Sequence, residues 1–186
     1  MSASVWYQQI GNDIDGNEGD FSGHSVSLSA DGKTLAVGSP ISDVNGDKNG
    51  SVKLYQNIGG TWIQIGNDID GEAEGDYLGS SVSLSADGRV VAIGAYGNDG
   101  NGVDSGHVRL YQYDDNGGSW VQIGNDIDGE AEEDSSGYSV SLSADGTVVA
   151  IGADGNDGNG VDSGHVRLYQ YDDNGGSWVQ IGNDID

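Results

Sequence analysis

Residues 80–95 have the sequence "SSVSLSADGRVVAIGA", and its two patterns decide the fold. Val82 and Leu84 alternate with serines, which is the period-two pattern of a strand with one buried face. Asp87-Gly88 is then a strong signal for a two-residue hairpin turn. The apolar run over residues 89–95 predicts a second strand that is covered on both faces. The segment therefore predicts an antiparallel hairpin.

Two more strands follow in the same unit. The sequence "GHVRLYQY" at 106–113 again alternates apolar and polar residues, and "WVQIG" at 120–124 follows the turn "DDNGGS". No segment of the chain has a helical period in its apolar residues. These patterns predict an all-β protein with four short strands per unit.

The unit is repeated along the chain. Ile10, Ile65, Ile123 and Ile181 occupy equivalent positions, which gives periods of 55, 58 and 58 residues. Residues 65–122 and 123–180 differ at only six positions. A fixed period of this kind is typical of solenoids, propellers and other repeat arrays.

Four antiparallel strands per repeat describe the blade of a β-propeller. The first two strands of each unit are rich in Ser, Gly and Ala, which suits a crowded central axis, while Trp, Tyr and Gln collect in the last two. A β-solenoid is the alternative, but hairpin turns inside each unit argue against parallel stacking. The predicted organisation is a single repeat domain 1–186, with an N-terminal rim strand and loop at 1–19, blade 1 at 20–75, blade 2 at 76–133 and blade 3 at 134–186.

The sequence "DFSGHSVSLSADGKTLAVGSP" at 20–40 resembles the FG-GAP, or integrin-alpha-like, β-propeller repeat. Phe21 and Gly23 match its "FG", and "GSP" at 38–40 matches its "GAP". The other units carry degenerate versions, "YLG" and "IGA" within 77–95 and "SSG" and "IGA" within 135–153. The resemblance implies a propeller used in adhesion or protein interaction.

The resemblance also implies a calcium loop between the first and second strands. At that place this chain has only the Asp-Gly hairpins at 31–32, 87–88 and 145–146. The calcium sites of the family are therefore not transferred to these positions.

Three blades are too few for a closed ring, since propellers usually have about four to eight. Two chains would supply six, so the sequence predicts a homodimer that closes as a six-bladed ring. The rim-strand sequence occurs at both ends of the chain, at 5–11 and 177–182, so one copy is surplus. That surplus leaves an open, polymerising assembly as the alternative.

Charge narrows the range of partners. The chain has 31 acidic and 6 basic residues and a formal net charge of −25. Such a surface repels phosphate groups, so we expect no nucleic-acid binding. No stretch approaches transmembrane length, so we expect no membrane insertion. There is no cysteine, and the N-terminus has no signal-peptide pattern. We expect an extracellular or cell-surface parent protein, with a second copy of the chain, other proteins or glycans as partners.

Two kinds of acidic loop are candidate calcium sites. The first begins in "DVNGDKNG", where oxygen donors alternate as at the start of a calcium loop, although the bidentate Glu at the twelfth position is missing. The alternative is an ordinary turn rich in Asn, Asp and Gly. The candidates of this kind are Asp43, Asn45, Asp47, Asn49, Asp99, Asn101, Asp104, Asp157, Asn159 and Asp162.

The second kind of acidic loop lies between blades, as in "NDIDGEAEGD" at 67–76. Its carboxylates repel one another, and a divalent cation would relieve the repulsion. The alternative is a solvated loop whose Asp side chains cap turns. The candidates are Asp68, Asp70, Glu72, Asp126, Asp128 and Glu130. Calcium is the cofactor predicted; zinc and copper are disfavoured because soft ligands are absent and histidines few, and His107 and His165 are expected on blade faces.

Trp6, Trp62, Trp120 and Trp178 are equivalent, and we expect them to pack blades together rather than to stack on sugars. No G-x-S-x-G elbow, HExxH or phosphate loop occurs, so the sequence predicts no enzymatic activity. The predicted function is a non-enzymatic scaffold or interaction module of the adhesion type. A lectin-like propeller with one glycan site per blade and an open repeat assembly are the alternatives.

Overall fold

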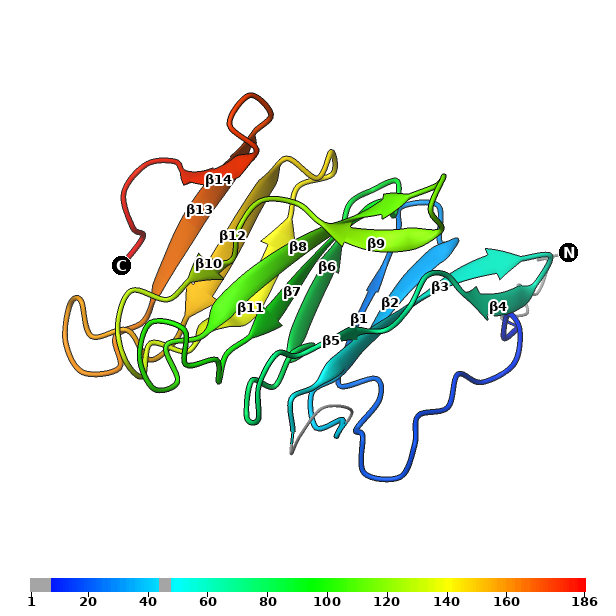
Figure 1. Cartoon of the computed structure of the whole chain (residues 1–186), viewed down its shortest axis with the longest axis horizontal. Coiled ribbons are helices and arrows are strands. Elements are labelled where there is room, and N and C mark those ends of the chain that lie inside the picture. Colours follow the sequence, from blue (N-terminus) through cyan, green and yellow to red (C-terminus); the bar gives the residue numbers. More distant parts are fainter. Residues whose placement is uncertain (1–7, 44–47) are drawn as a thin grey trace, which may run out of the picture.

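The computed structural model describes residues 8–43 and 48–186, which form three antiparallel sheets side by side (Figure 1). Trp6, Asn45 and Asp47 lie outside the described residues. No helix among the described residues is long and apolar enough to cross a membrane. The prediction of an all-β chain is confirmed.

Each sheet is one sequence unit. Unit 1 contains β1 (Ser25–Leu28), β2 (Thr34–Ser39), β3 (Ser51–Ile58), β4 (Thr61–Gln64) and β5 (Ile69–Asp70). Unit 2 contains β6 (Ser81–Leu84), β7 (Val90–Ala95), β8 (His107–Asp114), β9 (Ser119–Gln122) and β10 (Ile127–Asp128). Unit 3 contains β11 (Ser136–Leu142), β12 (Val148–Ala153), β13 (His165–Asp172) and β14 (Ser177–Gln180).

The first four strands of each unit pair in chain order, as predicted for a propeller blade. The sequence did not reveal β5 and β10, two-residue strands that return along the third strand of their unit. In unit 3 the same place is taken by the bridge between Val166 and Ile185. The C-terminal copy of the rim sequence is β14, the regular fourth strand of unit 3.

The turn after the first strand is wider than the two-residue hairpin that Asp87-Gly88 predicted. Ser85 and Val90 are still joined by a backbone hydrogen bond, so residues 86–89 form the turn. Asp87 accepts hydrogen bonds from the Ser85 hydroxyl and the Arg89 amide. The amide of Ala86 is not available to this turn, because it donates to the Ala144 carbonyl of unit 3.

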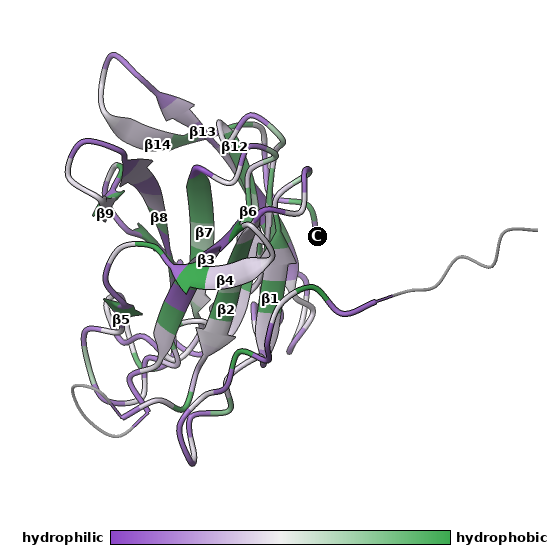
Figure 2. Ribbon diagram, turned by 90° about the vertical axis from the view of Figure 1, so that its right-hand side faces the viewer, coloured by the Kyte–Doolittle hydropathy of each residue, from purple (hydrophilic) through white to green (hydrophobic). Residues whose placement is uncertain are grey.

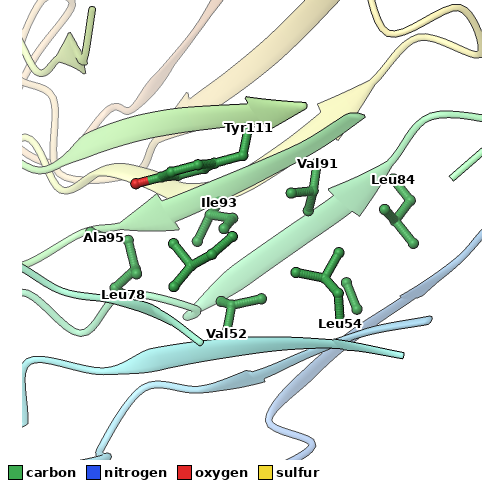
Figure 3. Packing of buried hydrophobic residues seen from close by; sticks show 10 residues of the cluster. Val52, Leu54, Leu78, Leu84, Val91, Ile93, Ala95 and Tyr111 are labelled. Carbon is green, nitrogen blue, oxygen red and sulfur yellow. The ribbon is translucent and has the colours of Figure 1, made fainter. Parts of the chain in front are cut away.

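The core lies between the units. Val52 and Leu54 of unit 1 pack against Val91 and Ile93 of unit 2, and all four are buried (Figure 3). An equivalent cluster joins units 2 and 3. Burying each such side chain contributes about 1.5–3 kcal/mol. Figure 2 shows β2 and β7 mainly in hydrophobic colours, while the loops are largely hydrophilic. Neighbouring units therefore stabilise one another.

Serines of the first strands join neighbouring units by hydrogen bonds. The Ser25 hydroxyl donates to the Gly79 carbonyl at 2.7 Å, and the Ser27 hydroxyl accepts from the Leu84 amide at 2.9 Å. One unit further along, Ser81 and Ser83 make the same bonds to Gly137 and Leu142. The alternating serines of the first strand are thus contacts between units, which explains why polar residues recur near the crowded side of each sheet.

Close approach between units also explains the glycine of the "GAP" segment. A Cβ atom on Gly38 would lie 2.1 Å from the Gly79 carbonyl oxygen, and one on Gly94 would lie 2.0 Å from that of Gly137. No side chain fits at such a distance from backbone. Glycine at this position lets successive sheets pack directly against each other.

Candidate functional site

The acidic loops of the chain meet at one end of the sheets. The loop between β7 and β8 touches the connection from unit 2 to unit 3: the Ser135 and Ser136 amides donate to the Asp104 and Ser105 carbonyls, both at 3.0 Å. The Asn101 side chain donates to the carbonyl of Gly129 at 2.8 Å. The two kinds of acidic loop that the sequence singled out are therefore neighbours.

Carboxylates in the loops after the second strands close those loops on themselves. Asp99 accepts from the Asp104 amide at 2.9 Å, and Asp157 accepts from the Asp162 amide at 2.8 Å. Asp43 accepts in the same way from the Lys48 amide at 2.9 Å. These contacts are those of an acidic turn, the alternative to a calcium loop. Calcium at these positions stays a prediction.

Two further predicted ligands in these loops, Asn49 and Asn159, differ in what they contact. Asn49 is buried, and its side-chain amide donates to the Gly71 carbonyl at 3.1 Å. Asn159 is exposed, and its backbone N–H donates to the Ser163 hydroxyl within the same loop.

The connections between units are held by a buried carboxylate. Asp76 is 1% exposed and accepts from the amides of Glu72 and Ala73, both at 2.9 Å, and from the Asn98 side chain at 3.1 Å. Asp134 makes the equivalent bonds in the next connection. This capping role is the alternative that the sequence left open, and it fixes the course of the loop that carries Glu72.

Three side chains from different segments converge beside this loop. Glu72 comes from the connection, His107 from the start of β8, and Asp126 from the turn before β10. One ligand atom from each lies within 4.8 Å of the other two, so the group could hold a metal ion. Nδ1 of His107 is 3.7 Å from Oδ2 of Asp126, and the Arg109 guanidinium is 3.2 Å from Glu72.

The surroundings of His107 favour the uncharged form of its imidazole. Burial lowers the pKa of His107, and the neighbouring Arg109 charge lowers it further, against the opposing effect of Asp126, Asp76 and Glu72. A neutral imidazole keeps a lone pair that can bind a metal ion.

The same arrangement recurs in unit 3. Nδ1 of His165 lies 3.9 Å from Glu130 and 4.0 Å from Asp184, and these three residues form the second group that could hold a metal ion. Arg167 is 3.5 Å from Glu130, as Arg109 is beside Glu72.

Of the predicted ligands, the structure brings Glu72, Asp126 and Glu130 into these groups. His107, His165 and Asp184 were not predicted, because the members of one group are separated by long stretches of sequence. The recurrence of each histidine two residues before an arginine, in equivalent strands, was the signal available.

The remaining predicted ligands of the connections lie outside the two groups and make other hydrogen bonds and ion pairs. Asp68 accepts from the Gln64 side chain at 2.6 Å and lies 3.6 Å from Lys53. Asp70 and Asp128 offer their backbone carbonyls to Arg109 and Arg167, at 3.0 and 2.8 Å.

The tryptophans contact the unit before them. Nε1 of Trp120 donates to the Ile65 carbonyl, and Nε1 of Trp178 donates to the Ile123 carbonyl. Both rings are half-buried and pack against the apolar clusters between units. This geometry supports the packing role expected of them.

The family comparison matches this repeated architecture. The model of the FG-GAP repeat matches residues 13–55 and 69–111. These two segments are FG-GAP repeats. Residues 127–169 repeat 69–111 with six substitutions, so the third unit has the same design. A comparison with curated proteins finds no match.

Solved structures share the fold at low sequence identity. The chain is similar to a protein of Bacteroides uniformis assigned as a 6-phosphogluconolactonase (14% identity, TM-score 0.57, covering 86% of this chain and 39% of that one). It is also similar to Saccharomyces cerevisiae Sqt1 (16%, TM-score 0.56, 89% and 36%) and to the periplasmic gluconolactonase of Pseudomonas aeruginosa (19%, TM-score 0.54, 85% and 44%). The chain thus spans less than half the length of these proteins, and its fold is propeller-like.

The prediction of no enzymatic activity is wrong, because proteins with this architecture include enzymes. Two of the similar structures bear the names of gluconolactonases, which are enzymes. The prediction rested on missing sequence motifs, but such motifs are specific to particular folds and do not cover the side chains that a propeller can bring together from distant segments.

Proposed function

We propose that the chain is a propeller-forming interaction module whose ring is completed head to tail by a second copy. The FG-GAP repeats support an interaction role of the adhesion type, and the propeller-like fold supports the closure of a ring. The observation that carries the proposal is that the two outermost faces of the chain are copies of faces that pack together inside it.

The open face of unit 3 is apolar and uncovered. Ile185 is 58% exposed, whereas Ile127, its equivalent in unit 2, is 5% exposed because unit 3 covers it. The opposite face of unit 1 is uncovered as well: Leu28 is 57% exposed and its equivalent Leu84 only 7%. Since faces of these two kinds form both interfaces within the chain, the face of unit 3 fits the face of unit 1 from another copy.

A cavity on unit 3 supports the same pairing. It has a volume of about 350 Å³ and is lined by residues that include Gly152, Gly164 and Val166. The equivalent residues of unit 2, Gly94, Gly106 and Val108, lie against the backbone of 136–137 in the next unit. In a second copy the corresponding segment is Ser22-Gly23, beside the exposed Phe21, and we expect it to fill this cavity.

A ring of near-identical units would present the same acidic loops several times at one end. With a net charge of −25, this end favours partners that carry positive charge, and repetition favours multivalent binding. This surface is the proposed interaction face of the module.

The test is the solution mass of the full chain, measured by light scattering after size exclusion. The expected result is twice the 19.1 kDa of one chain. Leu28→Asp should give a monomer with unchanged strand content by circular dichroism. Val179→Asp is the matched control, because Val179 is 51% exposed and its equivalent Val121 stays 51% exposed although both faces of unit 2 are covered.

A monomeric parent chain, or a dimer that survives Leu28→Asp, would overturn the proposal. A broad distribution of larger species would overturn closure by two copies and favour the open assembly.

A further inference from the structure

His107 is a buried polar residue whose imidazole makes no hydrogen bond to the described residues. Its side chain is 1% exposed, and Nε2 is buried without a hydrogen-bond partner among the described residues. Nδ1 points at Asp126 Oδ2 from 3.7 Å, which is too long for a hydrogen bond. His165 of unit 3 is 2% exposed and has the same unpartnered Nε2. Buried polar groups normally have hydrogen-bond partners, and Nδ1 of both rings faces carboxylates at distances too long for a hydrogen bond. Nδ1 is therefore the ring nitrogen placed to take a ligand.

The side chains around each imidazole carry more negative than positive charge, so a cation would be stabilised there. Glu72 and Asp126 bring two negative charges to His107, and Arg109 neutralises one of them through its 3.2 Å contact with Glu72. Only one of the Glu72 oxygens is engaged in that contact, which leaves the other free to bind. The group thus offers an imidazole nitrogen and two carboxylates, and Arg109 balances the charge of only one of these carboxylates.

Unit 1 shows a cation at the equivalent carboxylate. It has Ser51 in place of the histidine and Lys53 in place of Arg109. The Lys53 ammonium lies 3.6 Å from Asp68, the residue equivalent to Asp126. In units 2 and 3 the guanidinium contacts the glutamate instead, and a histidine faces this carboxylate. In unit 1, which lacks the histidine, a lysine therefore places a positive charge beside this carboxylate. In units 2 and 3 a histidine, which can bind a metal ion, occupies that place.

We propose that Glu72–His107–Asp126 and Glu130–His165–Asp184 each bind one zinc ion through Nδ1 and two carboxylates. Zinc takes imidazole nitrogen and carboxylate oxygen in a four-coordinate site, and the exposed side of Glu72 leaves room for water as the fourth ligand. Imidazole favours zinc over calcium and magnesium, which prefer oxygen alone. Since the glutamate belongs to the connection and the other ligands to the following unit, the ion links the two. These sites lie within one chain and do not depend on a second copy.

The test is calorimetric titration of the chelator-treated full chain with ZnCl₂. The expected result is two ions per chain. Glu72→Gln should remove one site and Glu72→Gln with Glu130→Gln both, with affinity at each altered site weakened more than about tenfold. Glutamine keeps the size of these exposed side chains, so folding is preserved. Glu74→Gln with Glu132→Gln is the matched control, because it removes the same charge from the same connections outside the two groups.

Retention of both sites in the control and their loss in the first pair would support the proposal. Equal titrations in the two double variants, or no saturable binding to the parent chain, would overturn it, since either result would assign the binding to the general acidity of the chain. A parallel titration with CaCl₂ should give weaker binding; calcium binding as tight as that of zinc at the same residues would overturn the assignment of the ion.

Discussion

The indole Nε1 of Trp120 donates a hydrogen bond to the backbone carbonyl of Ile65 at 3.1 Å, which ties β9 of unit 2 to the segment that leaves β4 of unit 1. The ring also packs against Tyr113 at 5.2 Å between centroids. Trp120→Phe keeps most of this packing but removes the donor. We expect a loss of about 1 kcal/mol in the free energy of unfolding, measured with urea.

Trp62→Phe serves as the comparison for that variant. Trp62 donates to the Ile10 carbonyl at 3.1 Å in a more exposed place. The loss should be smaller there, because water replaces the missing bond. Equal losses in both variants would contradict a larger contribution from the partly buried hydrogen bond of Trp120 than from the exposed one of Trp62.

Asp76 should be among the most sensitive acidic positions. Asp76→Ala leaves the amides of Glu72 and Ala73 and the side chain of Asn98 without their acceptor. Because hydrogen bonds to a charged group are strong and the site is buried, we expect a loss of about 3 kcal/mol in urea unfolding. Glu74→Ala, two residues away and exposed, should stay within about 0.5 kcal/mol of the parent chain.

Gly94 should tolerate no side chain. In Gly94→Ala the new Cβ would meet the Gly137 carbonyl of unit 3, so the two sheets must separate, at a cost of about 1–3 kcal/mol or more. Gly152→Ala is the matched variant in unit 3, where the nearest atom is the Ser139 hydroxyl, which can rotate away. The midpoint temperature of thermal unfolding should be clearly lower for Gly94→Ala than for Gly152→Ala. The reverse order would contradict the close contact between units.

Asp145 gives a prediction for pH. The Ser143 hydroxyl, followed by the Thr147 amide, lowers the pKa of Asp145. The ionised carboxylate therefore contributes stability above its unfolded pKa, and this contribution is lost as the pH falls through the folded value. Ser143→Ala should raise the pKa of Asp145 toward its ordinary value in a carboxyl NMR titration. Asp31, whose pKa is lowered by Ser29, should be unchanged in the same variant.

The strands could be predicted from sequence because their signals are local. The alternation around Val82 and Leu84 and the Asp87-Gly88 turn lie within a few residues of one another, and the structure has strands on both sides of that turn. The surroundings of His107 could not be predicted in the same way. They depend on how the chain brings Glu72, in the connection between units 1 and 2, close to Asp126, in the turn before β10. No local sequence pattern indicates this contact, because the two residues are 54 positions apart.

The same hydrogen bonds, from Ser25 to Gly79 and from Ser81 to Gly137, join both pairs of neighbouring units. A duplicated gene segment would therefore encode a unit that already fits its neighbours, with no compensating substitution needed. Units 2 and 3 bear the mark of such an event: none of their six differences falls in the second, third or fourth strand. The array can then change its length in whole units, while the differences between units 2 and 3 fall in the segments between strands and in the first strand, β11, of unit 3.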